Sequence, residues 1–330
     1  MSFLNKHHIL QCWSVLALSF AYPIIVFSCS KNDLPLYEYR LDNIDTVSVV
    51  YYTYNHWEPE GTISISQYAP LGFIHQSAAA YGDYVFLVNG GRSEICLYSL
   101  SKKEKLCSLS LNGVDGNKYH CNQSSFGIDK YDPSDAFPLL YISQRANSDN
   151  RCFIEVFRII PILEEKTSDY CSFSIDLIQT IYLPPMTYEN SLGNANCVID
   201  SANSVMYTYS RNNNSEEDNY GQCRITQFTI PALSYSTVYL EDKDILSSFT
   251  INCQAINMQG GCINEGVLYI GQGLQSAGYI YLNIIDLEKK SLVRRIDLQD
   301  YGVGWEPEGC FFYDGSVMIS HTSFISRVDK

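Results

Sequence analysis

Two carboxylates, Glu306 and Glu308, flank Pro307 in the segment WEPEG near the end of the chain. Proline fixes its own backbone and disfavours a helical residue before it, so this segment is predicted to be extended. Residues two apart in an extended strand project to the same side, and both carboxylates should therefore face one region. Such a pair can hold a cation or divide acid and base roles between its members, as glycosidases require. Either carboxylate can equally cap backbone amides of a neighbouring element.

Glu308 is also one of five polar residues that each precede a pair of apolar runs. In four cases the core of the second run lies ten residues after the polar residue, and in the fifth an insertion lengthens the turn. The five anchors are Gln76, Asn122, Asn196, Gln259 and Glu308. Four carboxamides and one carboxylate offer hydrogen bonds with little charge, which suits a hydroxyl-rich ligand or one cation held by oxygen atoms. The alternative is that these groups satisfy one another and channel water.

Trp305 stands beside the two carboxylates, and its ring can stack on a sugar or pack under a loop. The string WEPEG occurs a second time at residues 57–61. Only the copy at 305–309 is in phase with the anchors, because Glu308 lies ten residues before Met318. We therefore assign Trp305, Glu306 and Glu308 to the candidate ligand site and give the first copy no role.

Helical periodicity is nearly absent from the chain. It consists of short runs rich in β-branched and aromatic residues, such as DYVFLV and SVMYTYS, between polar turns, which predicts an all-β sandwich, barrel or propeller. The five anchors are 46 to 74 residues apart, and four-stranded propeller blades need about 40 to 50 residues plus loops. We therefore predict a β-propeller of five blades, with six as the alternative. The first strand of each blade lines the channel, so the anchors should ring one mouth.

The last repeat lacks an outer strand before the chain stops at Lys330. Residues 45–54, DTVSVVYYTY, are expected to supply it and to close the ring with an N-terminal strand, which leaves no open edge. The propeller is accordingly predicted to span residues 45–330 as a single domain.

Residues 1–28 have the layout of a secretory signal: a short polar start, an apolar run without charge, and an abrupt change to polar residues. The run is also long enough for an uncleaved membrane helix, which is the alternative. The sequence VFSC resembles the lipobox of bacterial lipoproteins, which implies lipidation of Cys29 and a tether over residues 29–44. The following CSKND resembles signals that send lipoproteins of Gram-negative bacteria to the outer face of the outer membrane. An exported outer-membrane lipoprotein is therefore expected.

The net charge of −14 would repel nucleic acid and anionic lipid head groups. Membrane contact is therefore expected only through the anchor, whereas sugars, peptides and metal ions remain open as ligands. The sequence contains no G-x-S-x-G, H-E-x-x-H or P-loop motif, and no catalytic residue is assigned.

Ten cysteines follow Cys29, none of them in a C-x-x-C pair. Most lie in apolar runs, where a free cysteine behaves as a small hydrophobe, so buried thiols are favoured over a disulfide framework. Cys96 and Cys107 flank the charged turn SKKEK and are placed to face each other across a hairpin.

Two segments, QGG with NEGVLYIG at 259–271 and EPEG with DGSVMIS at 306–320, carry a family resemblance. The chain resembles bacterial β-propeller lipoproteins of the TolB-like or six-bladed-type superfamily. EPEG at the start of a channel-lining strand is also similar to motifs of gluconolactonase-like, phytase-like and helveticin-like propellers. In the first two of these families a Glu in this neighbourhood helps to hold a divalent metal, which the resemblance carries over to Glu306 or Glu308, with Glu308 the better candidate. No full set of metal ligands matches, so a cation such as calcium stays an open cofactor.

These observations predict a lipid-anchored cell-envelope propeller that binds a carbohydrate or peptide at the channel mouth without catalysis. A metal-dependent hydrolase or lactonase using Glu308 with Asn196 and Gln259 is the first alternative. A scaffold for a partner envelope protein is the second.

Overall fold

Short runs of apolar and β-branched residues form twenty-one strands in the computed structural model, which describes residues 65–71, 75–89, 93–114, 121–144, 150–161, 173–185, 195–212 and 215–328. The predicted signal, Cys29 and the tether lie outside the described residues. Within the described part, no helix is long and apolar enough to cross a membrane.

The strands form five four-stranded units, in each of which sequence neighbours pair antiparallel. The first unit contains β2 (Ser77–Tyr81), β3 (Tyr84–Val88), β4 (Glu94–Ser99) and β5 (Glu104–Asn112). The second contains β6 (Cys121–Phe126), β7 (Leu140–Gln144), β8 (Phe153–Pro161) and β9 (Phe173–Tyr182). The third contains β10 (Asn196–Asp200), β11 (Val205–Arg211), β12 (Gln222–Thr229) and β14 (Ile245–Gln254). The fourth contains β15 (Met258–Asn264), β16 (Val267–Leu274), β17 (Tyr279–Asp286) and β18 (Ser291–Asp297).

The fifth unit joins the two ends of the described chain. It contains β19 (Pro307–Tyr313), β20 (Ser316–His321), β21 (Phe324–Val328) and the N-terminal β1 (Ile65–Pro70), which pairs antiparallel with β21. Closure by an N-terminal strand is thus confirmed, but the strand assigned to it was wrong. The position beside β21 belongs to residues 65–70, and residues 45–54 lie outside the described residues.

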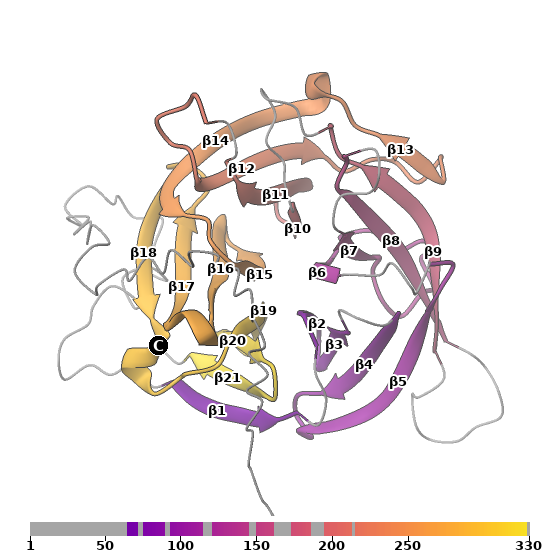
Figure 1. Ribbon diagram of the computed structural model, residues 1–330. Helices are drawn as coiled ribbons and strands as arrows, with labels where there is room; N and C mark the ends of the chain where they lie inside the picture. Colours follow the sequence, from indigo (N-terminus) through magenta and orange to yellow (C-terminus); the bar gives the residue numbers. More distant parts are fainter. Residues whose placement is uncertain are drawn as a thin grey trace, which may run out of the picture. The chain divides into compact units, whose positions relative to one another are not determined.

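The first strands of the five units, β2, β6, β10, β15 and β19, contact one another in a closed ring, and each unit extends outward from it (Figure 1). This arrangement confirms the all-β propeller, and the described residues make five blades. The first two blades are also joined at their outer strands, where β5 and β9 pair in parallel. Small elements complete the connections: β13 (Thr237–Tyr239), which pairs with β9, and the 3-10 turns η2 (Asp242–Asp244), η3 (Gln275–Ala277) and η4 (Leu298–Tyr301).

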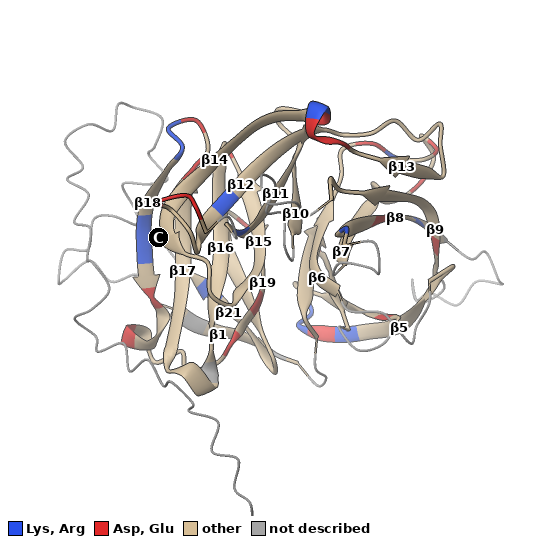
Figure 2. Ribbon diagram, turned by 45° about the horizontal axis from the view of Figure 1, so that its top comes forward, with Lys and Arg blue, Asp and Glu red and all other residues tan. Residues whose placement is uncertain are grey.

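Hydrophobic side chains hold the blades together face to face. Five buried clusters are present, and each draws its residues from two neighbouring blades. Phe86 of β3 and Phe157 of β8 share one cluster, for example, and both are fully buried. Burying a side chain of this size contributes about 1.5–3 kcal/mol, so blade contacts dominate the stability of the ring. Charged residues lie mainly on outer strands and turns, as on β5 and β18 (Figure 2), and the inner strands β2, β6 and β15 contain none.

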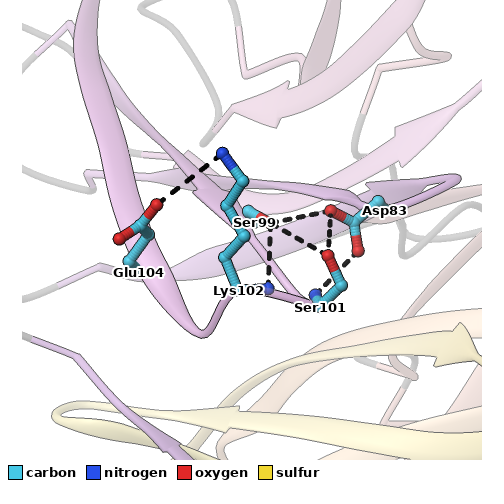
Figure 3. Close-up of polar contacts among 5 residues, drawn as sticks. All are labelled: Asp83, Ser99, Ser101, Lys102 and Glu104. Carbon is cyan, nitrogen blue, oxygen red and sulfur yellow. Dashed lines mark hydrogen bonds and ion pairs between the residues drawn. The ribbon is translucent and has the colours of Figure 1, made fainter. Parts of the chain in front are cut away.

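A polar cluster surrounds Asp83 (Figure 3), which follows β2 at the end of that strand opposite Gln76. Asp83, in the turn after β2, accepts hydrogen bonds from Ser99 Oγ (2.7 Å) and from the amide (2.7 Å) and Oγ (2.8 Å) of Ser101. Tyr313 of the neighbouring blade donates a further bond at 3.2 Å. Burial alone would raise the pKa of Asp83, but these hydrogen bonds lower it below its ordinary value. Asp83 is therefore a structural carboxylate that joins two blades.

The nine cysteines of the described residues are free thiols, most of them buried. Cys96 and Cys107 do not face each other, contrary to the sequence expectation. A β-bulge between Leu97 and Tyr98 shifts the register of β4 on β5 by one residue, so Cys107 lies opposite Leu97 and Cys96 opposite Ser108. Neighbouring positions of a strand project to opposite faces, so the two thiols point apart.

Candidate functional site

One side chain bridges the channel just below the anchors. Gln123 on β6 donates from Nε2 to the carbonyl oxygen of Gly261 on β15 (2.6 Å) and accepts at Oε1 from the amide of Gly261 (2.8 Å). A Cβ atom on Gly260 would lie 2.6 Å from the carbonyl oxygen of Glu308 and 2.7 Å from Gln123 Oε1. Only glycine fits in this space, so the inner strands close the channel here and any mouth site above it is shallow.

Three of the anchors leave buried polar atoms unpaired. Gln76, Asn122 and Asn196 lie within one residue of the starts of β2, β6 and β10, which are neighbours in the ring. Gln76 Oε1, Asn122 Nδ2 and Asn196 Oδ1 find no hydrogen-bond partner among the described residues. An unpaired buried polar atom costs about 1–3 kcal/mol. Because the set contains both acceptors and a donor, it is suited to groups that both donate and accept, such as hydroxyls.

A fourth anchor, Gln259, belongs to a connected polar network. Gln259 Nε2 donates to Glu306 Oε1, and the carbonyl oxygen of Gln259 accepts from Tyr209 Oη (2.6 Å) and Asn196 Nδ2 (3.3 Å). Tyr209 is fully buried, which ties this end of β15 to β11 of the preceding blade. The expectation that the anchors partly satisfy one another therefore applies to Gln259 and to one atom of Asn196.

Glu308 is the buried carboxyl group of the mouth, with only 6% of its surface exposed. Burial raises its pKa to about 8, and the nearby charge of Glu306 acts in the same direction. Burial also raises the pKa of Glu306. Near neutral pH Glu308 is therefore largely protonated, and a protonated carboxyl group can donate a hydrogen bond as well as accept one.

The residues of the mouth do not fit the divalent cation implied by the family resemblance. Gln259 directs its amide nitrogen, not its oxygen, toward Glu306, so its side chain offers no oxygen ligand beside that carboxylate. Calcium and magnesium require oxygen ligands, with carboxylates in the ionised form. Among the described residues, no group of three or more His, Cys, Asp or Glu side chains is placed to hold a metal ion.

Trp305 lies in a groove of about 370 Å³ formed with residues that are not anchors. The groove is bounded by the connection from β18 to β19 and by β1 and β21, and it is lined by Ile65, Gln67, Tyr301, Gly302, Val303, Trp305, Ser323, Phe324 and Ser326. The Trp305 side chain is exposed, and its ring meets that of Phe324 edge to face, with centroids 6.4 Å apart. We call this set of residues the rim groove.

His321, at the end of β20, connects the rim groove to the mouth. Its Nδ1 lies 3.0 Å from the carbonyl oxygen of Trp305 and 3.2 Å from that of Glu306, so this nitrogen carries the proton. Its ring stacks on Phe324 at 4.6 Å. Complete burial lowers the pKa of His321 to about 4, against the opposing effect of the two carbonyl oxygens. A neutral His321 therefore fixes the backbone between Trp305 and Glu306.

The structure thus links Asn196, Gln259 and Glu306 by hydrogen bonds and brings Glu308 close enough to Glu306 for their charges to interact. Their role in ligand binding stays a prediction. Sequence reasoning missed Gln123, His321 and Ser326. Gln123 directly follows an anchor, and alternation along a strand could have placed it on the other face. No local signal distinguishes His321 or Ser326 from other polar strand residues.

No protein-family model matches the chain, and no curated protein sequence matches it. Among solved structures, it is similar to glutaminyl cyclase of Myxococcus xanthus, with 11% identity, a TM-score of 0.47, and coverage of 81% of this chain and 95% of that one. A luciferin-regenerating enzyme gives 11% identity, a TM-score of 0.42 and the same coverage of 81% and 95%. A nidogen/laminin complex gives 10% identity and a TM-score of 0.38 over 72% of this chain and 69% of that one. Likeness at this level says nothing of activity, and function must be argued from the site.

Proposed function

We propose that this chain is a non-catalytic binding propeller of the cell envelope that takes a neutral carbohydrate at its channel mouth. The supporting observation is the set of unpaired buried atoms on three neighbouring inner strands, Gln76 Oε1, Asn122 Nδ2 and Asn196 Oδ1. Hydroxyl groups of a sugar can accept from the amide nitrogen and donate to the two oxygens. The secretory and lipobox-like patterns of the sequence support an exported, lipid-anchored protein, and its placement on the outer membrane is part of the same proposal.

The charge of the mouth favours a neutral ligand over an ionic one. Inner strands β2, β6 and β15 contain no charged residue, and burial keeps Glu308 largely protonated near neutral pH. A phosphate or carboxylate ligand would find no cation on these three strands. A peptide remains the alternative, because its backbone also both donates and accepts.

A glycan array and isothermal titration calorimetry of the purified full chain in mild detergent test this proposal. We expect binding to neutral glycans, and Asn122→Ala should weaken it about tenfold, which corresponds to about 1.4 kcal/mol for one lost hydrogen bond. Asn203→Ala is the control, because Asn203 lies in the turn at the other end of β10 and should leave binding unchanged.

Three outcomes would contradict the proposal. A folded wild-type chain that binds no glycan would remove the carbohydrate assignment, and selection of peptides in place of glycans would move it to the peptide alternative. Release of a cleaved product from a bound glycan would contradict the absence of catalysis.

A further inference from the structure

The rim groove contains an exposed aromatic ring, that of Trp305, which no Lys or Arg side chain of the described residues covers. Tyr131, Tyr220 and Tyr239 are also exposed, but each lies under an Arg side chain at 4.7–5.7 Å from the ring centroid. Trp305 is 45% exposed, and its ring contact among the described residues is the edge-to-face one with Phe324. A large apolar face is therefore left open to a ligand.

A polar side chain without a partner lies beside this face. Ser326 is 1% exposed and lines the rim groove, and its Oγ has no hydrogen-bond partner among the described residues. Gln67, which is exposed, offers an amide on the opposite strand β1. A buried polar group without a hydrogen-bond partner costs about 1–3 kcal/mol. A ligand hydroxyl that reached Ser326 Oγ would supply the missing partner and remove this cost.

Size and charge restrict the ligand. None of the residues lining the groove, all of which are described, is charged, so nothing there selects an ion. The volume of about 370 Å³ is at the lower end of the range of about 300–1,000 Å³ for small-molecule sites. A pyranose ring has an apolar face of C–H groups and a rim of hydroxyls, which matches an open indole beside Ser and Gln side chains.

We propose that the rim groove is a second binding site, in which a pyranose ring of a neutral glycan stacks on Trp305 and hydrogen-bonds Ser326 and Gln67. Phe324 supports the indole from its edge, and His321 holds the backbone of Trp305 through the 3.0 Å hydrogen bond to its carbonyl oxygen. The inference stands on the geometry of the groove and does not require the mouth site.

The test is titration of the purified full chain with a panel of neutral hexasaccharides, namely cello-, malto-, laminari- and mannohexaose. Tryptophan fluorescence and calorimetry are the readouts. We expect one member of the panel to bind and to change the Trp fluorescence, with a dissociation constant at least tenfold higher in Trp305→Ala and about three- to tenfold higher in Ser326→Ala. Tyr235→Ala is the matched control, because Tyr235 is 70% exposed but lies outside the groove, and it should change affinity less than twofold.

The two proposed sites fail in different ways. If Asn122→Ala removes binding and Trp305→Ala does not, the rim groove is overturned while the mouth site stands. The reverse result supports the groove and contradicts the mouth. A wild-type chain that binds no hexasaccharide of the panel, or one in which folded Trp305→Ala and Ser326→Ala both bind like wild type, overturns this inference. Circular dichroism of each variant establishes that it is folded.

Discussion

Two carboxyl groups at opposite ends of the inner strands show how differently this propeller treats the same chemical group. Asp83 accepts hydrogen bonds from Ser99, Ser101 and Tyr313, and its pKa is lowered. Glu308 is nearly inaccessible to solvent, and burial raises its pKa to about 8. The first is satisfied by the fold and belongs to the structure. The second, which lies at the same end of the inner strands as the unpaired amides, is a group that a ligand could satisfy better than the fold does.

The largest expected effect that tests this contrast is the pH dependence of stability. The folded-state pKa of Glu308 is above its unfolded value of 4.5, so its contribution is complete below about pH 4.5 and is lost as pH rises toward 8. At about 1.4 kcal/mol per pKa unit, the difference between 4.5 and about 8 corresponds to a loss on the order of 5 kcal/mol. Glu308→Gln cannot ionise and should be more stable than wild type at pH 9 but not at pH 4.5. Urea unfolding over this pH range measures the difference in the free energy of unfolding between the two proteins.

Asp83→Asn is the comparison variant. The folded-state pKa of Asp83 is lowered, so its stabilisation is present above its unfolded pKa and is lost only as pH falls through the folded value. Asp83→Asn should therefore lower the free energy of unfolding by about 1–2 kcal/mol throughout pH 5 to 9, without changing how that free energy depends on pH.

For the first variant, parallel pH profiles of stability for wild type and Glu308→Gln would show that Glu308 is not held in its neutral form.

The repeat of anchors predicted the blades because each blade is a local unit with its own hydrophobic alternation. The closing strand was misassigned because DTVSVVYYTY at 45–54 has a stronger β pattern than ISQYAP at 65–70, which forms β1. Pairing with β21 decides the strand, and that pairing spans nearly the whole chain. Local propensity could not detect it.

For the candidate site too, the local repeat was predictable from the sequence and the long-range contacts were not. The anchors lie at the starts of the inner strands, as their periodicity indicated. Contacts across the channel, such as Gln123 with Gly261, join residues 138 apart and leave no trace in a local pattern. The placement of Cys96 failed for a related reason, because a single bulge at Leu97 shifts the register that a regular hairpin would have.

The next prediction compares the stability effect of adding a methyl group at Gly260, between the inner strands beneath the mouth, with that of adding one at Gly304, at the rim. Gly260→Ala would place a methyl group 2.6 Å from a backbone oxygen and 2.7 Å from the Cα atom of Gly309, neither of which can move as a flexible side chain would. We expect a loss of about 2–3 kcal/mol in the free energy of unfolding. Gly304→Ala is the matched control at the rim, where the added atom has nothing within 4 Å, and it should change stability by less than about 0.5 kcal/mol. Equal melting temperatures for the two variants would mean that the inner strands are not in close contact.

The last comparison separates two adjacent residues of β6, Gln123, which closes the channel, and Asn122, which is free for a ligand. Gln123→Ala removes the hydrogen-bond partners of the Gly261 N–H and of the Gly261 carbonyl oxygen. Leaving these two buried groups without a partner should cost about 2 kcal/mol of stability. Asn122→Ala removes an amide whose nitrogen has no partner among the described residues, so it should leave stability unchanged or slightly higher. Denaturant unfolding of both variants measures the difference. If Asn122→Ala were the more destabilising of the two, Asn122 would belong to the structure with Asp83, and the mouth would lose the group that distinguishes it.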